Sequence, residues 1–342
     1  MKFDNSVWST ASARAGAVLR CSLTRSARRI RRGWSDTVAD LASQDTAANP
    51  ALRAAIPRPS DRTLLRLSGA TLTLVGILLL GFVVQVVGVS ELSEVRAQNL
   101  LYQDFRVQLA SATAPVSQVD AHNRLYPLGT PVAVISVPAI GMRQVVVEGT
   151  SSRVLLTGPG HRRDTPLPGQ SGPSVILGRQ SAYGAPFGTI SQLRAGDVIT
   201  TTTGQGVSHY TVTKVRFAGD PQPAALTGTS GRLTLVSAVG LPYLPYGVVR
   251  VDATLTSRAF VTPNPVLLVG SLTDSEGTLA SDPSGWLPLT FLLEGAIAAI
   301  ILFSIANRRW GRWHTWIVAV PVSLLLGAGI GEQIIVLLPN LY

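Results

Sequence analysis

The side chains that most often carry catalysis or bind metals are few and scattered in this chain of 342 residues. Its single cysteine, Cys21, lies in an arginine-rich N-terminal segment, so an intramolecular disulfide is excluded. Its four histidines do not cluster with cysteine or carboxylates at the spacing of a metal site. No Ser-His-Asp spacing is visible, although such partners are assembled in space. We therefore expect no metal ion and no cofactor.

Three polar side chains, Gln85, Glu294 and Glu332, interrupt long apolar runs. At about 1.5 Å per helical residue, each lies within roughly 10 Å of the outer end of its run. Buried carboxyls in lipid are costly and usually find partners, so we predict that the three side chains meet. Gly327 and Gly331 would allow close helix approach beside Glu332. Two interpretations remain open: a proton or ion path, and a structural contact that docks another membrane subunit.

The apolar runs themselves predict a multi-pass plasma-membrane protein. The chain is 46% hydrophobic and 14% charged, which is too apolar for an ordinary soluble protein. We predict transmembrane helices at 64–90, 287–306 and 316–338, each near the 20 residues that a span needs. The basic N-terminal segment 1–63 and the basic loop 307–315 are then cytoplasmic.

Basic charge in the N-terminal segment is expected to signal topology and to meet anionic membrane lipids. The formal net charge of +10 is concentrated before residue 64. The segment predicts either an amphipathic helix on the membrane surface or a disordered region. It contains no recognisable nucleic-acid-binding module, so nucleic acid is not an expected partner.

The region between the first and second spans is expected to fold outside the membrane. Residues 91–126 predict a stalk helix and a linker, and residues 257–286 predict a second linker. Residues 127–256 predict an all-β barrel or sandwich, because short β-rich runs alternate with Gly, Pro and polar turns. These runs are 131–137, 143–148, 174–177, 197–203, 207–216, 232–237 and 248–255.

Several sequence blocks in this region carry a resemblance to a known family. Gly129–Gly141 reads Gly-Thr-Pro-Val-Ala-Val-Ile-Ser-Val-Pro-Ala-Ile-Gly, and the strand at 233–238 reads Leu-Thr-Leu-Val-Ser-Ala. Five further blocks lie at 145–150, 158–161, 167–172, 184–187 and 193–197. In this order they resemble sortases, the cell-surface transpeptidases of Gram-positive bacteria, and in particular the class E and related actinobacterial sortases. The resemblance covers roughly residues 98–256 and implies a sortase-like barrel outside the membrane.

The resemblance also implies where three catalytic groups should lie. Sortases use a cysteine nucleophile, a histidine and an arginine. The cysteine position falls on Ala238, the histidine position on Arg179 and the arginine position on Tyr246. A methyl group cannot form a covalent intermediate, and arginine remains protonated, so it cannot act as a base. The resemblance therefore implies a catalytically inactive domain, a pseudosortase.

Neighbouring residues do not replace the missing groups. Ser237 is the nearest hydroxyl, but successive strand residues point to opposite faces, so it should face away from the pocket at Ala238. His161 falls in a Gly-Pro-Gly-His turn that sortases keep without using the histidine as the proton carrier. We interpret it as a structural turn residue.

We therefore predict a membrane-anchored binding or scaffolding subunit of a cell-envelope complex. Its partners would be other envelope or membrane proteins, or an extended peptide in a groove lined by Arg179, Gln180 and Tyr246. The alternative for this site is a filled former active site in which Arg179 is salt-bridged to Asp164 or Asp220. Two other functions remain open: a cysteine-independent transpeptidase or hydrolase with relocated catalytic residues, and a receptor for an outside peptide signal.

Overall fold

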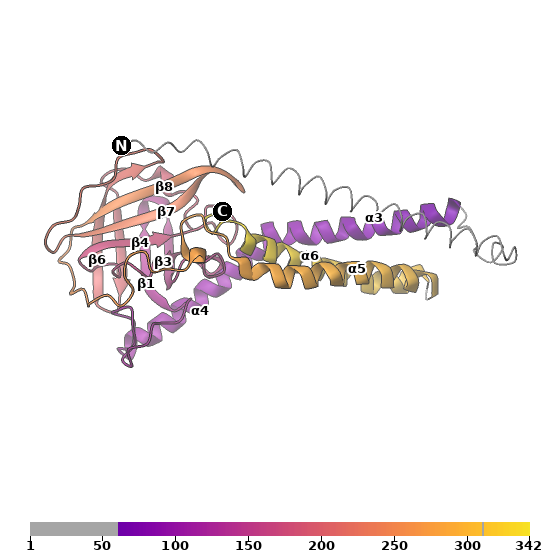
Figure 1. Ribbon diagram of the computed structural model, residues 1–342, viewed down its shortest axis with the longest axis horizontal. Helices are drawn as coiled ribbons and strands as arrows, with labels where there is room; N and C mark the ends of the chain where they lie inside the picture. Colours follow the sequence, from indigo (N-terminus) through magenta and orange to yellow (C-terminus); the bar gives the residue numbers. More distant parts are fainter. Residues whose placement is uncertain (1–60, 310) are drawn as a thin grey trace, which may run out of the picture. The chain divides into compact units, whose positions relative to one another are not determined.

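The computed structural model describes residues 61–309 and 311–342. The predicted basic segment 1–63, with Cys21, lies outside these residues except for its last three positions. The helical elements are α3 (Asp61–Val84), η1 (Gln85–Val89), α4 (Ser90–Ala110), α5 (Trp286–Arg309) and α6 (Arg312–Leu337) (Figure 1). The strands are β1 (Pro131–Val137), β2 (Met142–Glu148), β3 (Gly160–His161), β4 (Gly172–Leu177), β5 (Val198–Thr203), β6 (Gly206–Arg216), β7 (Gly231–Leu241) and β8 (Leu244–Leu255).

The eight strands form a closed barrel in the order β1-β2-β3-β4-β7-β8-β6-β5. The pairs β2–β3 and β4–β7 are parallel, and the other pairs are antiparallel. The predicted all-β barrel is confirmed. Strand β3 has only two residues, which is too short for an alternating pattern to indicate it.

Alternation of apolar and polar residues places one face of each strand inside the barrel. Leu233 and Leu235 of β7 are fully buried there and pack with Ile176 of β4 and Val251 of β8. Closure removes the exposed strand edges that an open sheet would present. The interior is therefore a packed core, and any site must lie on the outer face of the barrel or at its ends.

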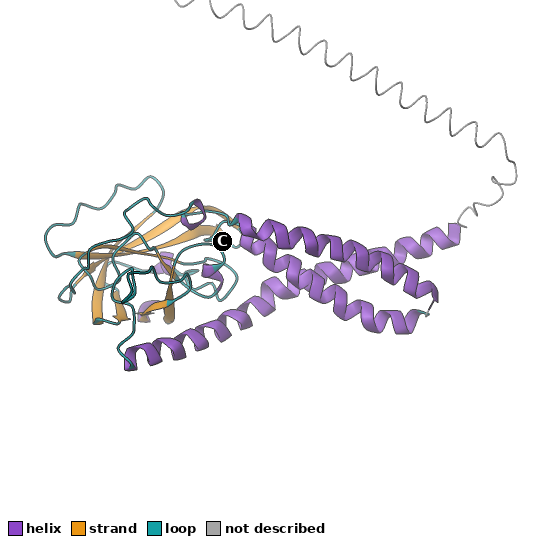
Figure 2. Ribbon diagram, turned by 60° about the horizontal axis from the view of Figure 1, so that its bottom comes forward, coloured by secondary structure: helices purple, strands orange, loops and turns teal. Residues whose placement is uncertain are grey.

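Among the described residues, three helices are long and apolar enough to cross a membrane: Thr71–Ala110, Pro283–Arg309 and Trp313–Leu337. The first runs through α3 and α4 and contains the π-helical turn η1 between them. The helices α5 and α6 lie side by side in both views (Figures 1 and 2). They pack through a cluster that includes Leu289, Ala296 and Ile330.

Glycines bring α3 and α6 into backbone contact. A Cβ atom placed on Gly327 would overlap the carbonyl oxygen of Leu78, and one on Gly81 would lie 2.6 Å from that of Leu324. A Cβ atom placed on Gly331 would lie 3.1 Å from the side chain of Phe82. The Gly327 and Gly331 pattern thus permits the close approach that small residues allow between membrane helices.

This contact predicts different effects for two identical substitutions. Gly327→Ala should lower stability by about 1–3 kcal/mol, because its methyl group meets rigid backbone. Gly76→Ala is the matched control: no atom lies within 4 Å of a Cβ at this α3 position. That substitution should be neutral or stabilise by up to about 1 kcal/mol through helix propensity. Thermal unfolding in detergent, followed by circular dichroism, measures both; equal melting temperatures for the two variants would contradict the packing.

Candidate functional site

Ala238 lies near the end of β7, on the outer face of the barrel. Leu233 and Leu235 belong to the interior core, whereas Val236 and Ala238 belong to a second apolar cluster. Ser237 is fully buried and donates a hydrogen bond to the carbonyl oxygen of Gly178 at 3.0 Å. Its hydroxyl is engaged with backbone and is on the opposite face of the strand from Ala238.

The cluster around Ala238, which we call the Ala238 cluster, contains only aliphatic side chains at its centre. Its members are Leu155, Leu177, Val236, Ala238, Val248 and Leu341. Ala238 is 3% exposed, and Val248 is its register partner on β8. The partly buried side chains of Val175 and Tyr342 pack against this cluster.

Arg179 follows β4 and is 1% exposed. Its Nη2 donates to the Ser152 carbonyl oxygen at 3.0 Å and to the Ser152 hydroxyl at 2.7 Å. Its Nη1 donates to the main-chain oxygen of Tyr342 at 2.9 Å. Burial lowers the pKa of Arg179 to about 10, and Tyr183 and Tyr243 partly oppose this shift. The side chain is still a cation at neutral pH and cannot serve as a general base.

The salt bridge expected from Arg179 to Asp164 or Asp220 is not formed. Asp164 instead pairs with Arg162, whose Nε lies 2.8 Å from its Oδ1. The carboxylate of Asp220 accepts a hydrogen bond from the backbone N–H of Phe217. The position of Arg179 is fixed by oxygens of Ser152 and Tyr342 and not by an aspartate.

Gln180 holds the segment after α6 against the end of β7. Its backbone N–H donates to the carbonyl oxygen of Leu341 at 2.9 Å. Its side-chain Nε2 donates to the carbonyl oxygen of Gly240 at 2.7 Å. The predicted groove residue therefore contacts a segment of this same chain.

Tyr246 does not join Arg179. It is 83% exposed on β8, beyond the register position that faces Ala238. The register of β7 and β8 shifts between Val239 and Gly240. The residue opposite Ala238 is therefore Val248, two residues beyond Tyr246. The tyrosines that act electrostatically on Arg179 are Tyr183 and Tyr243.

His161 lies in β3 and is fully buried. Its Nδ1 lies 2.9 Å from a carboxylate oxygen of Glu148, and its Nε2 lies 3.0 Å from the carbonyl oxygen of Pro166. An oxygen atom thus faces each ring nitrogen, and the imidazole of His161 connects β2 to the loop after β3. Within residues 61–309 and 311–342, no three His, Cys, Asp or Glu side chains are placed to hold a metal ion.

Two of the three polar residues of the spans lie near the site. Gln85, in η1, is 7% exposed, and its side chain would lie 3.5 Å from a Cβ atom placed on Gly331 of α6. Burial raises the pKa of Tyr183, and the Glu332 carboxylate contributes to the rise. Glu294 is exposed on α5. The structure therefore places Gln85 beside α6, one residue before Glu332, and leaves Glu294 on the surface of the helix pair.

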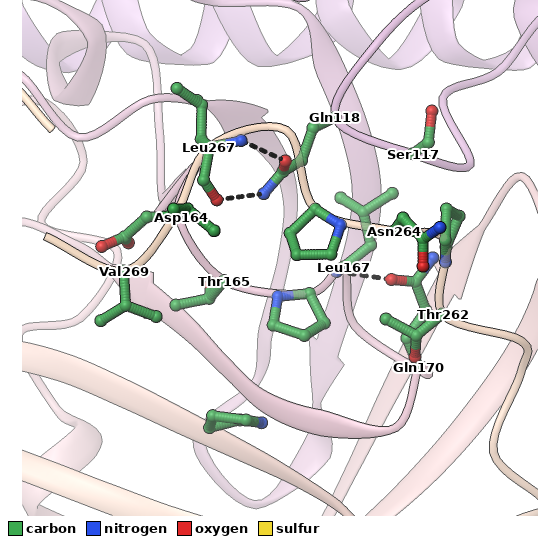
Figure 3. Close-up of a pocket in the computed structure, with 15 residues that line it drawn as sticks. Ser117, Gln118, Asp164, Thr165, Leu167, Gln170, Thr262, Asn264, Leu267 and Val269 are labelled. Atoms are coloured by element: carbon green, nitrogen blue, oxygen red, sulfur yellow. Dashed lines mark hydrogen bonds between the residues drawn. The ribbon is translucent and has the colours of Figure 1, made fainter. Parts of the chain in front are cut away.

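A separate pocket of about 280 Å³ lies between the loop after β3 and residues 262–269 (Figure 3). Gln118 crosses it: its Oε1 accepts from the N–H of Leu267 at 2.9 Å, and its Nε2 donates to the Leu267 carbonyl oxygen at 3.3 Å. Gln170 likewise accepts from the N–H of Leu167 and donates to the carbonyl oxygen of Val116. Both amides are engaged, and none of the predicted site residues lines this pocket.

Comparisons with known proteins bear on the barrel. Residues 135–243 match the model of the sortase domain family. Among solved structures, sortase E from Streptomyces avermitilis is 29% identical, with 39% of this chain and 91% of that chain covered and a TM-score of 0.34. A sortase from Corynebacterium diphtheriae is 25% identical, with 47% and 100% covered and a TM-score of 0.35. The sortase D5 transpeptidase from Clostridium perfringens is 20% identical, with 47% and 99% covered and a TM-score of 0.40. A search of curated proteins gives no match.

The burial of Arg179 and the exposure of Tyr246 predict opposite outcomes for their substitution. Arg179→Ala should destabilise the protein by about 3–5 kcal/mol, because it leaves a cavity and removes three hydrogen bonds. Tyr246→Ala should change stability by no more than about 0.5 kcal/mol, as is usual for an exposed side chain. Chemical denaturation in detergent measures both. A stable Arg179→Ala protein would contradict the role given to this guanidinium.

Proposed function

We propose that the protein is a membrane-anchored sortase relative that binds other proteins without catalysing transpeptidation. The proposal starts from the match of residues 135–243 to the sortase domain family. One observation carries the proposal: the cysteine position is Ala238, in a cluster of aliphatic side chains that is closed to solvent. Acyl transfer needs a nucleophile and a base within hydrogen-bond reach of it. Ala238 supplies neither, and the guanidinium of Arg179 is committed to Ser152 and Tyr342.

The proposed partners are other membrane or cell-envelope proteins. Three helices apolar enough to span a membrane support anchoring beside such proteins. Crosslinking in native membranes, followed by mass spectrometry, tests this part of the proposal. Recovery of uncrosslinked protein alone would count against a scaffolding role.

The proposed orientation places the N-terminus in the cytoplasm and the barrel outside, because basic residues accumulate before the first span and between the last two. The single native cysteine gives a direct test. In intact cells, a membrane-impermeant maleimide should not label Cys21, but it should label a cysteine at the exposed barrel position Leu241 in a Cys21→Ser background. Labelling of Cys21 without disruption of the membrane would refute this orientation.

The absence of acyl-transfer chemistry predicts the result of an activity-based labelling experiment. The purified full chain should form no covalent adduct with a peptide that ends in a carbonyl electrophile. A cysteine-dependent sortase under the same conditions is the positive control. Intact-mass spectrometry reads both.

An adduct on the extracytoplasmic domain would overturn the proposal and favour a transpeptidase or hydrolase with relocated catalytic residues. Peptide mapping would then identify the attacking residue. Ser237 is an informative control position, because its hydroxyl is buried and bonded to Gly178. An adduct lost in Ser237→Ala would assign the attack to that hydroxyl.

A further inference from the structure

The chain that follows α6 lies against the barrel and packs into the Ala238 cluster. Asn340 is fully buried: its Nδ2 donates to the carbonyl oxygens of Thr150, at 2.7 Å, and Gly277, at 2.8 Å. Its backbone N–H donates to the carbonyl oxygen of Ala280 at 2.8 Å. Three backbone carbonyls therefore hold this residue in place.

The next residue fills the apolar part of the site. Leu341 is 0% exposed and packs with Ala238, Leu177 and Val248. Its carbonyl oxygen accepts the backbone N–H of Gln180. An apolar side chain in a pocket and a main-chain oxygen on a backbone donor are the contacts by which proteins hold an extended peptide.

Arg179 completes the contact one residue further on. Its Nη1 donates to the main-chain oxygen of Tyr342, while Ser152 takes its Nη2. The Ser152 hydroxyl also lies 3.3 Å from the carbonyl oxygens of Ile335 and Leu338, at the end of α6. The contact made by Arg179 is thus linked to the position of α6.

We infer that the site at Ala238 is a peptide-binding site whose resident ligand is the segment 340–342 of this chain. The site takes a leucine-like side chain against Ala238, with consecutive main-chain oxygens on Gln180 and Arg179. A peptide of the same chemistry from another protein binds only when segment 340–342 leaves. This inference rests on the proposed function, because it treats the site as a binding site without chemistry.

The arrangement sets a threshold for any competing peptide. A ligand tethered by a short connection has an effective concentration in the millimolar range. A free peptide with the same contacts therefore competes poorly with the resident segment until that segment is released. Because only Leu338 and Pro339 separate α6 from segment 340–342, a change in the position of α6 would act on the occupancy of the site.

A thiol placed under Leu341 reports whether segment 340–342 covers the site. In a Cys21→Ser background, the thiol of Ala238→Cys should react with a maleimide slowly in the full chain. The same thiol should react at least about tenfold faster in a chain ending at Asn340, because the covering side chain is gone. Leu241→Cys, at a position that is 69% exposed, is the matched control and should react fast in both chains.

A synthetic peptide with the sequence of residues 338–342, Leu-Pro-Asn-Leu-Tyr, tests ligand binding directly. It should slow the reaction of the thiol at position 238 in the shortened chain, whereas a peptide with aspartate in place of the second leucine should not. Two results would each overturn the inference. One is an equally fast reaction of the Ala238→Cys and Leu241→Cys variants in the full chain. The other is a failure of the peptide to protect the thiol at position 238 in the shortened chain.

Folding and function are controlled separately. Circular dichroism establishes whether the shortened chain folds. If the shortened chain does not fold, the full chain with Leu341→Ala takes its place. The thiol of Ala238→Cys should then react at least about tenfold faster than it does with Leu341 present. An unchanged rate overturns the inference. A maleimide rate does not depend on catalysis. A covalent adduct at another residue would refute the proposed function and leave this result unaffected.

Discussion

The structure around the site depends on the burial of one guanidinium group that has no aspartate or glutamate partner among the described residues. A buried charge is costly unless hydrogen bonds replace its hydration. Arg179 obtains them from Ser152 and from the main-chain oxygen of Tyr342, and its Nε has no partner among the described residues. The end of β4, the loop before β3 and the residues after α6 must therefore stay together for the charge to remain satisfied.

The loop that follows Arg179 is held in an unfavourable backbone conformation by the same packing. Ala182, Tyr183 and Ala185 have φ angles of 57°, 46° and 41°, and Gly184 between them has 71°. Left-handed conformations cost about 1–2 kcal/mol for each residue with a side chain. Burial of the Tyr183 ring offsets part of that cost. Such strain persists only where the surroundings fix the backbone.

Local patterns predicted the barrel and the membrane helices, because strand alternation and long apolar runs are local properties. The opposite faces of Ser237 and Ala238 followed from the same alternation. The partner of Ala238 on β8 did not, because the register shift after Val239 depends on the hairpin geometry. The role of Leu341 also lay beyond sequence reasoning: a few residues after a span show no periodicity, and only tertiary packing places them in the cluster.

Gln85, a polar residue at the end of an apolar helix, is buried beside Gly331 of α6. An unpaired amide in hydrocarbon would lose its hydrogen bonds to water, which costs roughly 2–7 kcal/mol for a polar group. Gln85 begins the π-helical turn η1, a type of turn that is frequent at functional sites. Its side chain packs beside Gly331 and so joins the first apolar helix to α6. Because Ser152 reaches the end of α6, this helix contacts a residue that binds Arg179 next to the Ala238 cluster. The cluster is therefore closed by contacts from this helix as well as by the barrel that carries Ala238.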